Sequence, residues 1–211
     1  MNNSTNPETI AFYNVPLVCG AAPSTGCGSR AKPLLVDLEQ QALIKEAWLN
    51  RTGTILAIVW RGPTRMEEVG GPVLERHEVQ YTERPDDKQT AESFRIEGAW
   101  FRGAEVDRLS LEEARKIAET SMASITKDGL VSVEEATQIK SDIEAYFRKE
   151  LVKFRTKEEL RQDVRSKFPE AVISICEKHI GTERTAAVQA RGIQNPFDHA
   201  DREKTSGCCP R

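Results

Sequence analysis

Residues 54–60 constrain the fold of this chain more than any other part of the sequence. They read TILAIVW, a run of apolar and branched side chains without a charge. Such a run is typical of a strand that is buried on both faces, since a half-exposed strand would alternate with polar residues. The run therefore predicts a buried strand, which needs other elements packed against both of its sides.

The residues that precede this strand predict a strand–loop–helix–strand unit. Residues 12–18 (FYNVPLV) are expected to form a short strand, which Pro16 would restrict to the edge of a sheet. Residues 34–49 carry apolar side chains at helical spacing, and Pro33 suits the first turn of a helix. With the strand at 54–60 this order resembles a βαβ unit, whose first turn would contain residues 19–33.

The rest of the chain divides into a strand-like middle and a helical half. Residues 72–83 and 93–103 alternate and are expected to be strands. Three capping-box sequences, beginning at Ser110, Ser132 and Thr156, each open an amphipathic segment, and a further helix is expected over residues 169–179. The expected fold class is α+β or α/β, with a mixed domain at 1–105, a helical region at 106–192 and a flexible tail at 193–211.

Charge and hydropathy narrow the class of partner. The chain has 30 basic and 33 acidic residues, a net charge of −3, and no basic cluster of the kind that binds nucleic acid. No apolar stretch approaches the roughly 20 residues that span a bilayer. The first residues lack a basic segment followed by an apolar one, so no export signal is expected. The sequence therefore predicts a cytoplasmic protein that binds neither nucleic acid nor membranes.

The cysteines carry the most concentrated chemistry of the sequence. They are Cys19, Cys27, Cys176, Cys208 and Cys209. An odd number in a chain without an export signal argues against a framework of structural disulfides. In a reducing compartment such cysteines are expected to be reactive thiols or metal ligands.

Cys19 and Cys27 enclose a loop of small residues, CGAAPSTGC, that could bring the two sulfurs within disulfide distance. Arg30 and Lys32 follow closely, and no acidic residue lies between Glu8 and Asp37. A helix that begins after the loop would add the positive end of its dipole, which favours a thiolate. Cys19, Cys27 and Arg30 are therefore the candidate catalytic residues, and no cofactor is expected for their chemistry.

Three functions remain open from these residues. The first is thiol–disulfide exchange by Cys19 and Cys27 with a protein partner or thiol substrate. In this function Cys208 and Cys209 would resolve the disulfide or deliver electrons to the Cys19/Cys27 site. The second is a soft-metal site, in which a C-x-x-H pair completes a zinc-type set; its ligands would be Cys19, Cys27, Cys176 and His179. Core packing is the simpler explanation of Cys176. The third is a non-catalytic subunit or interaction protein of a larger assembly, in which the cysteines are incidental.

Two weaker patterns have plainer explanations. Residues 124–135 resemble an EF-hand loop, but Ser124 and Thr126 stand where carboxylates are usual. A turn at Asp128 and Gly129, followed by a helix capped by Ser132, is the expected structure, and calcium is not expected. His77 and His199 belong to no recognisable catalytic pattern.

Overall fold

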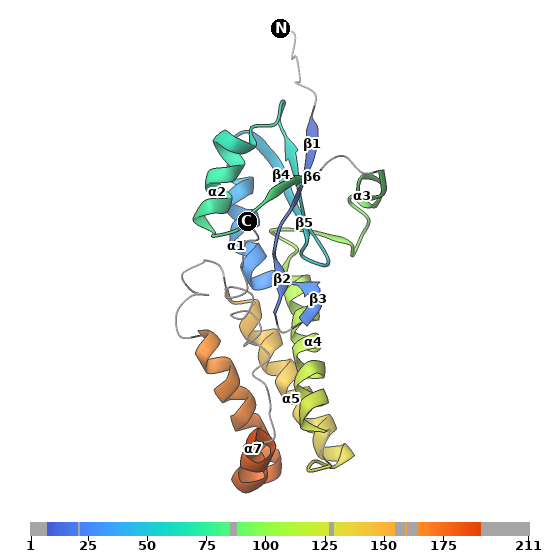
Figure 1. The fold of residues 1–211 in the computed structure, drawn as a ribbon, viewed down its shortest axis with the longest axis vertical. Helices are drawn as coiled ribbons and strands as arrows, with labels where there is room; N and C mark the ends of the chain where they lie inside the picture. The colour runs from blue at the N-terminus through green and yellow to red at the C-terminus, as the bar shows by residue number, and fades with distance from the viewer. Residues whose placement is uncertain are drawn as a thin grey trace, which may run out of the picture.

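The computed structural model describes residues 8–20, 22–84, 88–126, 129–154, 159 and 164–190. Within these ranges an antiparallel sheet of five strands occupies the N-terminal half, and long helices make up the C-terminal half (Figure 1). The expected combination of a small sheet and a helical half is confirmed, and its class is mixed α+β.

The described residues form helices and strands in the following order. In the sheet region they are β1 (Thr9–Asn14), β2 (Val18–Cys19), β3 (Ala22–Gly26), α1 (Gly28–Glu39), β4 (Ile44–Asn50), β5 (Ile55–Trp60), the π-helical turn η1 (Met66–Gly70), α2 (Gly71–Arg76), β6 (Thr82–Arg84), α3 (Lys88–Ser93) and β7 (Trp100–Arg102). The helical half contains α4 (Asp107–Ile125), α5 (Val133–Leu151) and α7 (Val164–Ala190), which is interrupted at Gly181.

The strands of the main sheet lie in the order β6-β1-β5-β4-β7, and every described pair is antiparallel. The expected βαβ unit is therefore wrong. A parallel crossover needs a helix between two strands of the same direction, whereas β1 pairs antiparallel with β5 and α1 connects the small β2–β3 hairpin to β4. The hairpin forms a separate two-stranded sheet.

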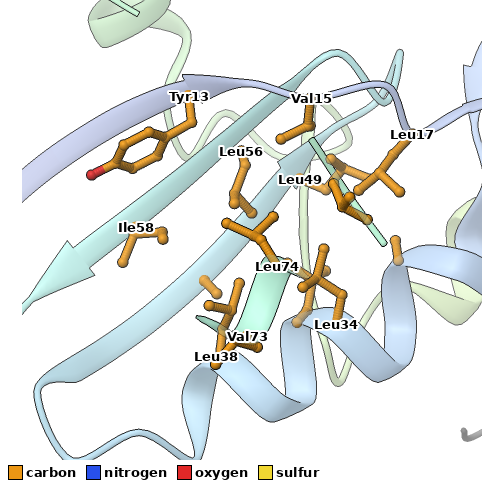
Figure 2. Packing of buried hydrophobic residues seen from close by; sticks show 14 of the residues in the cluster. Tyr13, Val15, Leu17, Leu34, Leu38, Leu49, Leu56, Ile58, Val73 and Leu74 are labelled. Carbon is orange, nitrogen blue, oxygen red and sulfur yellow. The ribbon is translucent and has the colours of Figure 1, made fainter. Parts of the chain in front are cut away.

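The strand expected at residues 54–60 is confirmed as β5, which is buried on both faces. Leu56 and Ile58 point toward the layer that contains α1, where Leu34 and Leu38 meet them (Figure 2). Ala57 points to the opposite face and packs in a separate cluster with Phe12 and Trp100. Successive residues of a strand face opposite sides, so an unbroken apolar run can fill two cores.

The helix expected at residues 34–49 is wrong in its second half. Helix α1 ends at Glu39, and β4 takes over from Ile44. The buried residues of β4 are Ile44, Ala47 and Leu49, and a register irregularity between Ile44 and Glu46 breaks their alternation. This irregularity makes the apolar spacing resemble that of a helix.

The two strands expected in the middle of the chain are only partly correct. The segment 72–83 begins as helix α2, which carries Pro72 in its first turn, and only its end enters β6. The segment 93–103 becomes a strand only at β7. Pro favours the first turn of a helix because its missing N–H has no partner there in any case.

The core around α4, α5 and α7 also takes in Cys19, Ala22 and Cys27 from the segment between β2 and α1. Phe147 of α5 and Phe168 of α7 stack edge to face with ring centroids 5.0 Å apart. The capping box at Ser132 is confirmed, since its side chain accepts from the N–H of Glu135. Ser110 does not cap a helix, because α4 already begins at Asp107, and Thr156 lies outside the described residues. No helix in the described part of the chain is long and apolar enough to cross a membrane.

Candidate functional site

The β2–β3 hairpin brings Cys19 and Cys27 together. The loop between them was expected to lack regular structure, yet Cys19 pairs with Ala22 across the hairpin. Gly26 N–H donates to the carbonyl of Arg51, which follows β4, at 2.8 Å and holds the hairpin to the main sheet region. Cys27 N–H donates to the Leu17 carbonyl at 2.7 Å and extends the pairing of the hairpin itself. The small residues of the loop therefore form an ordered turn that ends at Cys27.

Cys27 is the N-cap of α1, and its backbone is extended while the next residue begins the helix. Its carbonyl accepts the first bond of the helix, from Ala31 N–H at 3.0 Å. The helix begins well before the Pro33 at which the sequence predicted its first turn. This earlier start places the Cys27 sulfur at the positive end of the helix dipole.

Gly28 lets α1 approach α4 more closely than any other residue would allow. A Cβ at this position would lie 2.3 Å from Ser110 Oγ and 2.8 Å from the Ser110 backbone nitrogen. One turn further along α4, Glu113 Oε2 accepts a hydrogen bond from Gly28 N–H at 3.0 Å. The close approach thus brings an acidic side chain to the first amide of α1.

Glu113 is the residue of this site that the sequence analysis missed. Its side chain was assigned to a capping box at Ser110, but Glu113 is 2% exposed and lies within α4. The signal was available in the sequence, because Leu109 and Ile117 stand four positions before and after Glu113 and are both buried. Residues four apart share one face of a helix. Glu113 therefore stands in the apolar stripe of α4.

The pKa values of Cys19, Cys27 and Glu113 are shifted in different directions. The thiol of Cys19 donates a hydrogen bond to Cys27, which is the largest influence lowering the pKa of Cys27, to about 5. The same bond, together with burial and the charge of Glu113, raises the pKa of Cys19 well above its usual value. Burial, followed by the charge of Cys27, raises the pKa of Glu113. These directions make Cys27 the thiolate of the pair and keep the proton on Cys19.

Arg30 and Ser29 add to the stabilisation of the Cys27 thiolate. The Cys27 sulfur lies 3.4 Å from Ser29 Oγ. The backbone N–H of Arg30 and its positive charge both lower the pKa of Cys27. Lys32 instead forms an ion pair with Asp107, whose two carboxylate oxygens lie 2.5 and 2.7 Å from the Lys32 ammonium. Of the two cations in the loop sequence, the structure thus brings Arg30 to the thiolate.

Two features expected of the cysteines are wrong. The structure contains no disulfide between Cys19 and Cys27, because both are free thiols, as is Cys176. The metal set is also wrong, since the described residues include no group of three or more His, Cys, Asp or Glu side chains that could hold an ion. Cys176 is buried in the core of the helical half, and His179 Nε2 bonds to Asp142 at 2.9 Å. These contacts explain the C-x-x-H pair as packing and as an interhelical bond.

The remaining candidates lie elsewhere. Cys208, Cys209 and His199 fall outside the described residues. His77 follows α2, and its Nε2 bonds to Asp37 at 2.7 Å. The carboxylate of Glu135 bonds to Ser132 N–H and to Arg184, so it serves the helix cap.

An open groove of about 1050 Å³ lies between the end of β1 and the segment from η1 to β6. Its lining includes Val15, Pro72, Val79 and Tyr81, with glutamates at its rim. Cys19, Cys27 and Glu113 do not line this groove. The groove therefore lies apart from the cysteine site, where the pKa of Cys27 is lowered to about 5.

Comparisons of the chain with protein-family models, with curated proteins and with solved structures give no match. The chemistry of Cys19, Cys27 and Glu113 is therefore the basis on which a function is assigned.

Proposed function

We propose that this protein performs thiol–disulfide exchange, with Cys27 as the attacking thiolate and Cys19 as the second thiol. The observation that carries the proposal is the pKa of Cys27, lowered to about 5 by the hydrogen bond from Cys19. The thiolate is the nucleophile in this chemistry, and the attacking group must be ionised at the working pH. A Cys27 with this pKa is almost fully ionised near neutral pH.

The exchange has two steps. The Cys27 thiolate attacks one sulfur of a substrate disulfide, forms a mixed disulfide, and expels the other substrate sulfur as a thiolate. Cys19 then gives up its proton, and its sulfur attacks the sulfur of Cys27. The bond between Cys27 and the substrate breaks, and its electron pair leaves with the second substrate sulfur. The substrate disulfide is reduced by two electrons, and the cysteine pair is oxidised by two.

Burial of the pair favours a substrate that is small or extended. Cys19 is 4% and Cys27 8% exposed, so a folded domain cannot reach either sulfur in this conformation. Gly20 and Ser24 of the β2–β3 hairpin, which are close to the two cysteines in the sequence, are exposed. A small disulfide, or an extended segment of a protein partner, would enter beside this hairpin. We place this reaction in the cytoplasm, because a reducing compartment keeps free thiols reduced.

The proposal is tested by trapping the mixed disulfide in the full-length chain. The background variant is Cys208→Ser/Cys209→Ser, so that the tail thiols do not react. Reduced protein is incubated with oxidised glutathione and analysed by peptide mass spectrometry. We expect Cys19→Ser to accumulate glutathione on Cys27, and Cys27→Ser to accumulate far less at either position.

Cys176→Ala is the matched control, because Cys176 is also a buried free thiol but lies on α7, where burial raises its pKa to about 11. It should exchange like the background protein. Equal labelling of the Cys19→Ser and Cys27→Ser variants, or failure of the background protein to be oxidised at all, would exclude the proposed reaction.

A further inference from the structure

We infer that Glu113 transfers protons for the Cys19 and Cys27 pair, taking the proton of Cys19 and giving one to the departing substrate sulfur. This role rests on the proposed exchange reaction and assigns the proton path of that reaction. Thiol–disulfide exchange needs only the two thiols, so the buried carboxyl group of Glu113 calls for a separate explanation.

The position of Glu113 is the first support for this role. Cys19 and Cys27 are both near enough to shift its pKa through side-chain hydrogen bonds. Its Oε2 is also fixed by Gly28 N–H at 3.0 Å. A proton-transfer group must lie within hydrogen-bond reach of the atoms between which it moves the proton. Glu113 meets this condition for both thiols.

The surroundings of Glu113 are the second support. The side chain is 2% exposed, and a buried carboxyl group without a cation partner normally stays protonated. The groups that face it are Cys19 from β2 and Cys27 at the start of α1; Arg30 of α1 acts on Cys27. Within the described residues no Lys or Arg bonds to Glu113, since Lys32 is paired with Asp107.

The proton balance of the exchange then closes. Before the reaction the site holds an anionic Cys27, a protonated Cys19 and a protonated Glu113. The first substrate thiolate to leave takes the proton of Glu113, whose carboxylate then accepts the proton of Cys19. The Cys19 sulfur attacks Cys27, and the second substrate thiolate takes this proton from Glu113. The products are two substrate thiols, an oxidised cysteine pair and an ionised Glu113, so charge and protons are conserved.

The test compares Glu113→Gln with Glu112→Gln in the Cys208→Ser/Cys209→Ser background. Glutamine keeps an oxygen for Gly28 N–H but cannot carry a proton. Glu112 is the matched control, because it is the neighbouring acid of α4 and pairs with Arg51 at 2.9 Å outside the thiol cluster. Infrared difference spectra between reduced and oxidised protein report on the protonated carboxyl group. Rapid-mixing measurements with oxidised glutathione separate the first step from the second.

We expect the control protein to lose a protonated-carboxyl band on oxidation, and Glu113→Gln to lack that band. Both steps should slow in Glu113→Gln, because the first loses the proton donor for its leaving thiolate and the second loses the acceptor for the proton of Cys19; the second should slow on the order of 100-fold. Exchange by Glu112→Gln should change little. An ionised Glu113 in the reduced protein at neutral pH would overturn the inference even where exchange is observed. Failure of exchange would remove the proposed function, while the infrared spectra of the reduced protein would still report the protonation of Glu113.

Discussion

Gly28 and Glu113 are 85 positions apart in the sequence, yet the N–H of the first donates to Oε2 of the second at 3.0 Å. This bond joins the start of α1 to the buried face of α4. It therefore connects the sheet region, which holds the cysteine hairpin, to the helical half, which supplies the acid. The site exists only when both parts are folded together.

Replacement of Glu113 by glutamine should change how stability depends on pH. The lowered pKa of Cys27 contributes stability that is full above its unfolded value and is lost as the pH falls toward about 5. The raised pKa of Glu113 has the opposite effect, since its contribution is full at low pH and is lost as the pH rises. In the natural protein the two slopes oppose each other.

In Glu113→Gln the contribution of Glu113 to the pH dependence of stability is absent, and that of Cys27 remains. The free energy of unfolding should then rise by up to about 1.4 kcal/mol per pH unit above pH 5. Urea unfolding of Glu113→Gln and Glu112→Gln over a series of pH values measures the difference. Parallel curves for the two variants would show that Glu113 is not protonated in the folded state.

Gly28→Ala should destabilise the protein by about 1–3 kcal/mol, because the new methyl group would collide with the backbone and side chain of Ser110. Thermal or urea unfolding measures the loss. Gly129→Ala is the control, since its position is open and only its positive φ of 67° opposes a side chain. A smaller loss for Gly28→Ala than for Gly129→Ala would contradict the close approach of α1 to α4.

The ion pair between Lys32 and Asp107 gives a third prediction. Lys32 is 6% exposed, and removing its partner leaves a nearly buried charge. Asp107→Asn should therefore cost about 2 kcal/mol, less than a fully buried pair because Asp107 is partly exposed. Lys32→Met should cost less than Asp107→Asn, since it removes the buried charge itself. The reverse order in unfolding experiments would exclude a stabilising pair.

The cap of α5 predicts a modest effect. Ser132→Ala removes the side-chain acceptor for Glu135 N–H and should lower the free energy of unfolding by about 1 kcal/mol. Thr137→Ala is the control, because Thr137 is also an exposed hydroxyl residue of α5 but bonds only within the helix. Equal losses for the two variants would argue against the capping box.

The parts of the fold that sequence predicted correctly depend on neighbouring residues alone. The apolar run at residues 54–60 predicts the doubly buried β5, and the Ser132 capping box predicts the start of α5. The start of β4 was misread because its irregularity at Ile44 and Glu46 disguises the alternation of a strand. That irregularity depends on pairing with β5, which the local sequence does not contain.

The candidate site was predicted only in part, for the same reason. The acid-free stretch around Cys27 predicts a thiolate, and the position of Arg30 agrees with it. The apolar neighbours Leu109 and Ile117 indicate that Glu113 is buried, but they do not indicate which groups it contacts. Only the contact between α1 and α4 turns this glutamate into a buried partner of the thiols.

The titration of Cys27 tests the central claim most directly, because every step of the proposed chemistry begins with its thiolate. Thiolate absorbance or alkylation rate is followed against pH in the Cys208→Ser/Cys209→Ser background, with and without Cys19→Ser. We predict a midpoint near pH 5 for Cys27, and a higher midpoint in Cys19→Ser, since the bond from Cys19 is the largest lowering influence. A midpoint near the ordinary value of 9, unchanged by Cys19→Ser, would contradict the assignment of Cys27 as the reactive thiolate.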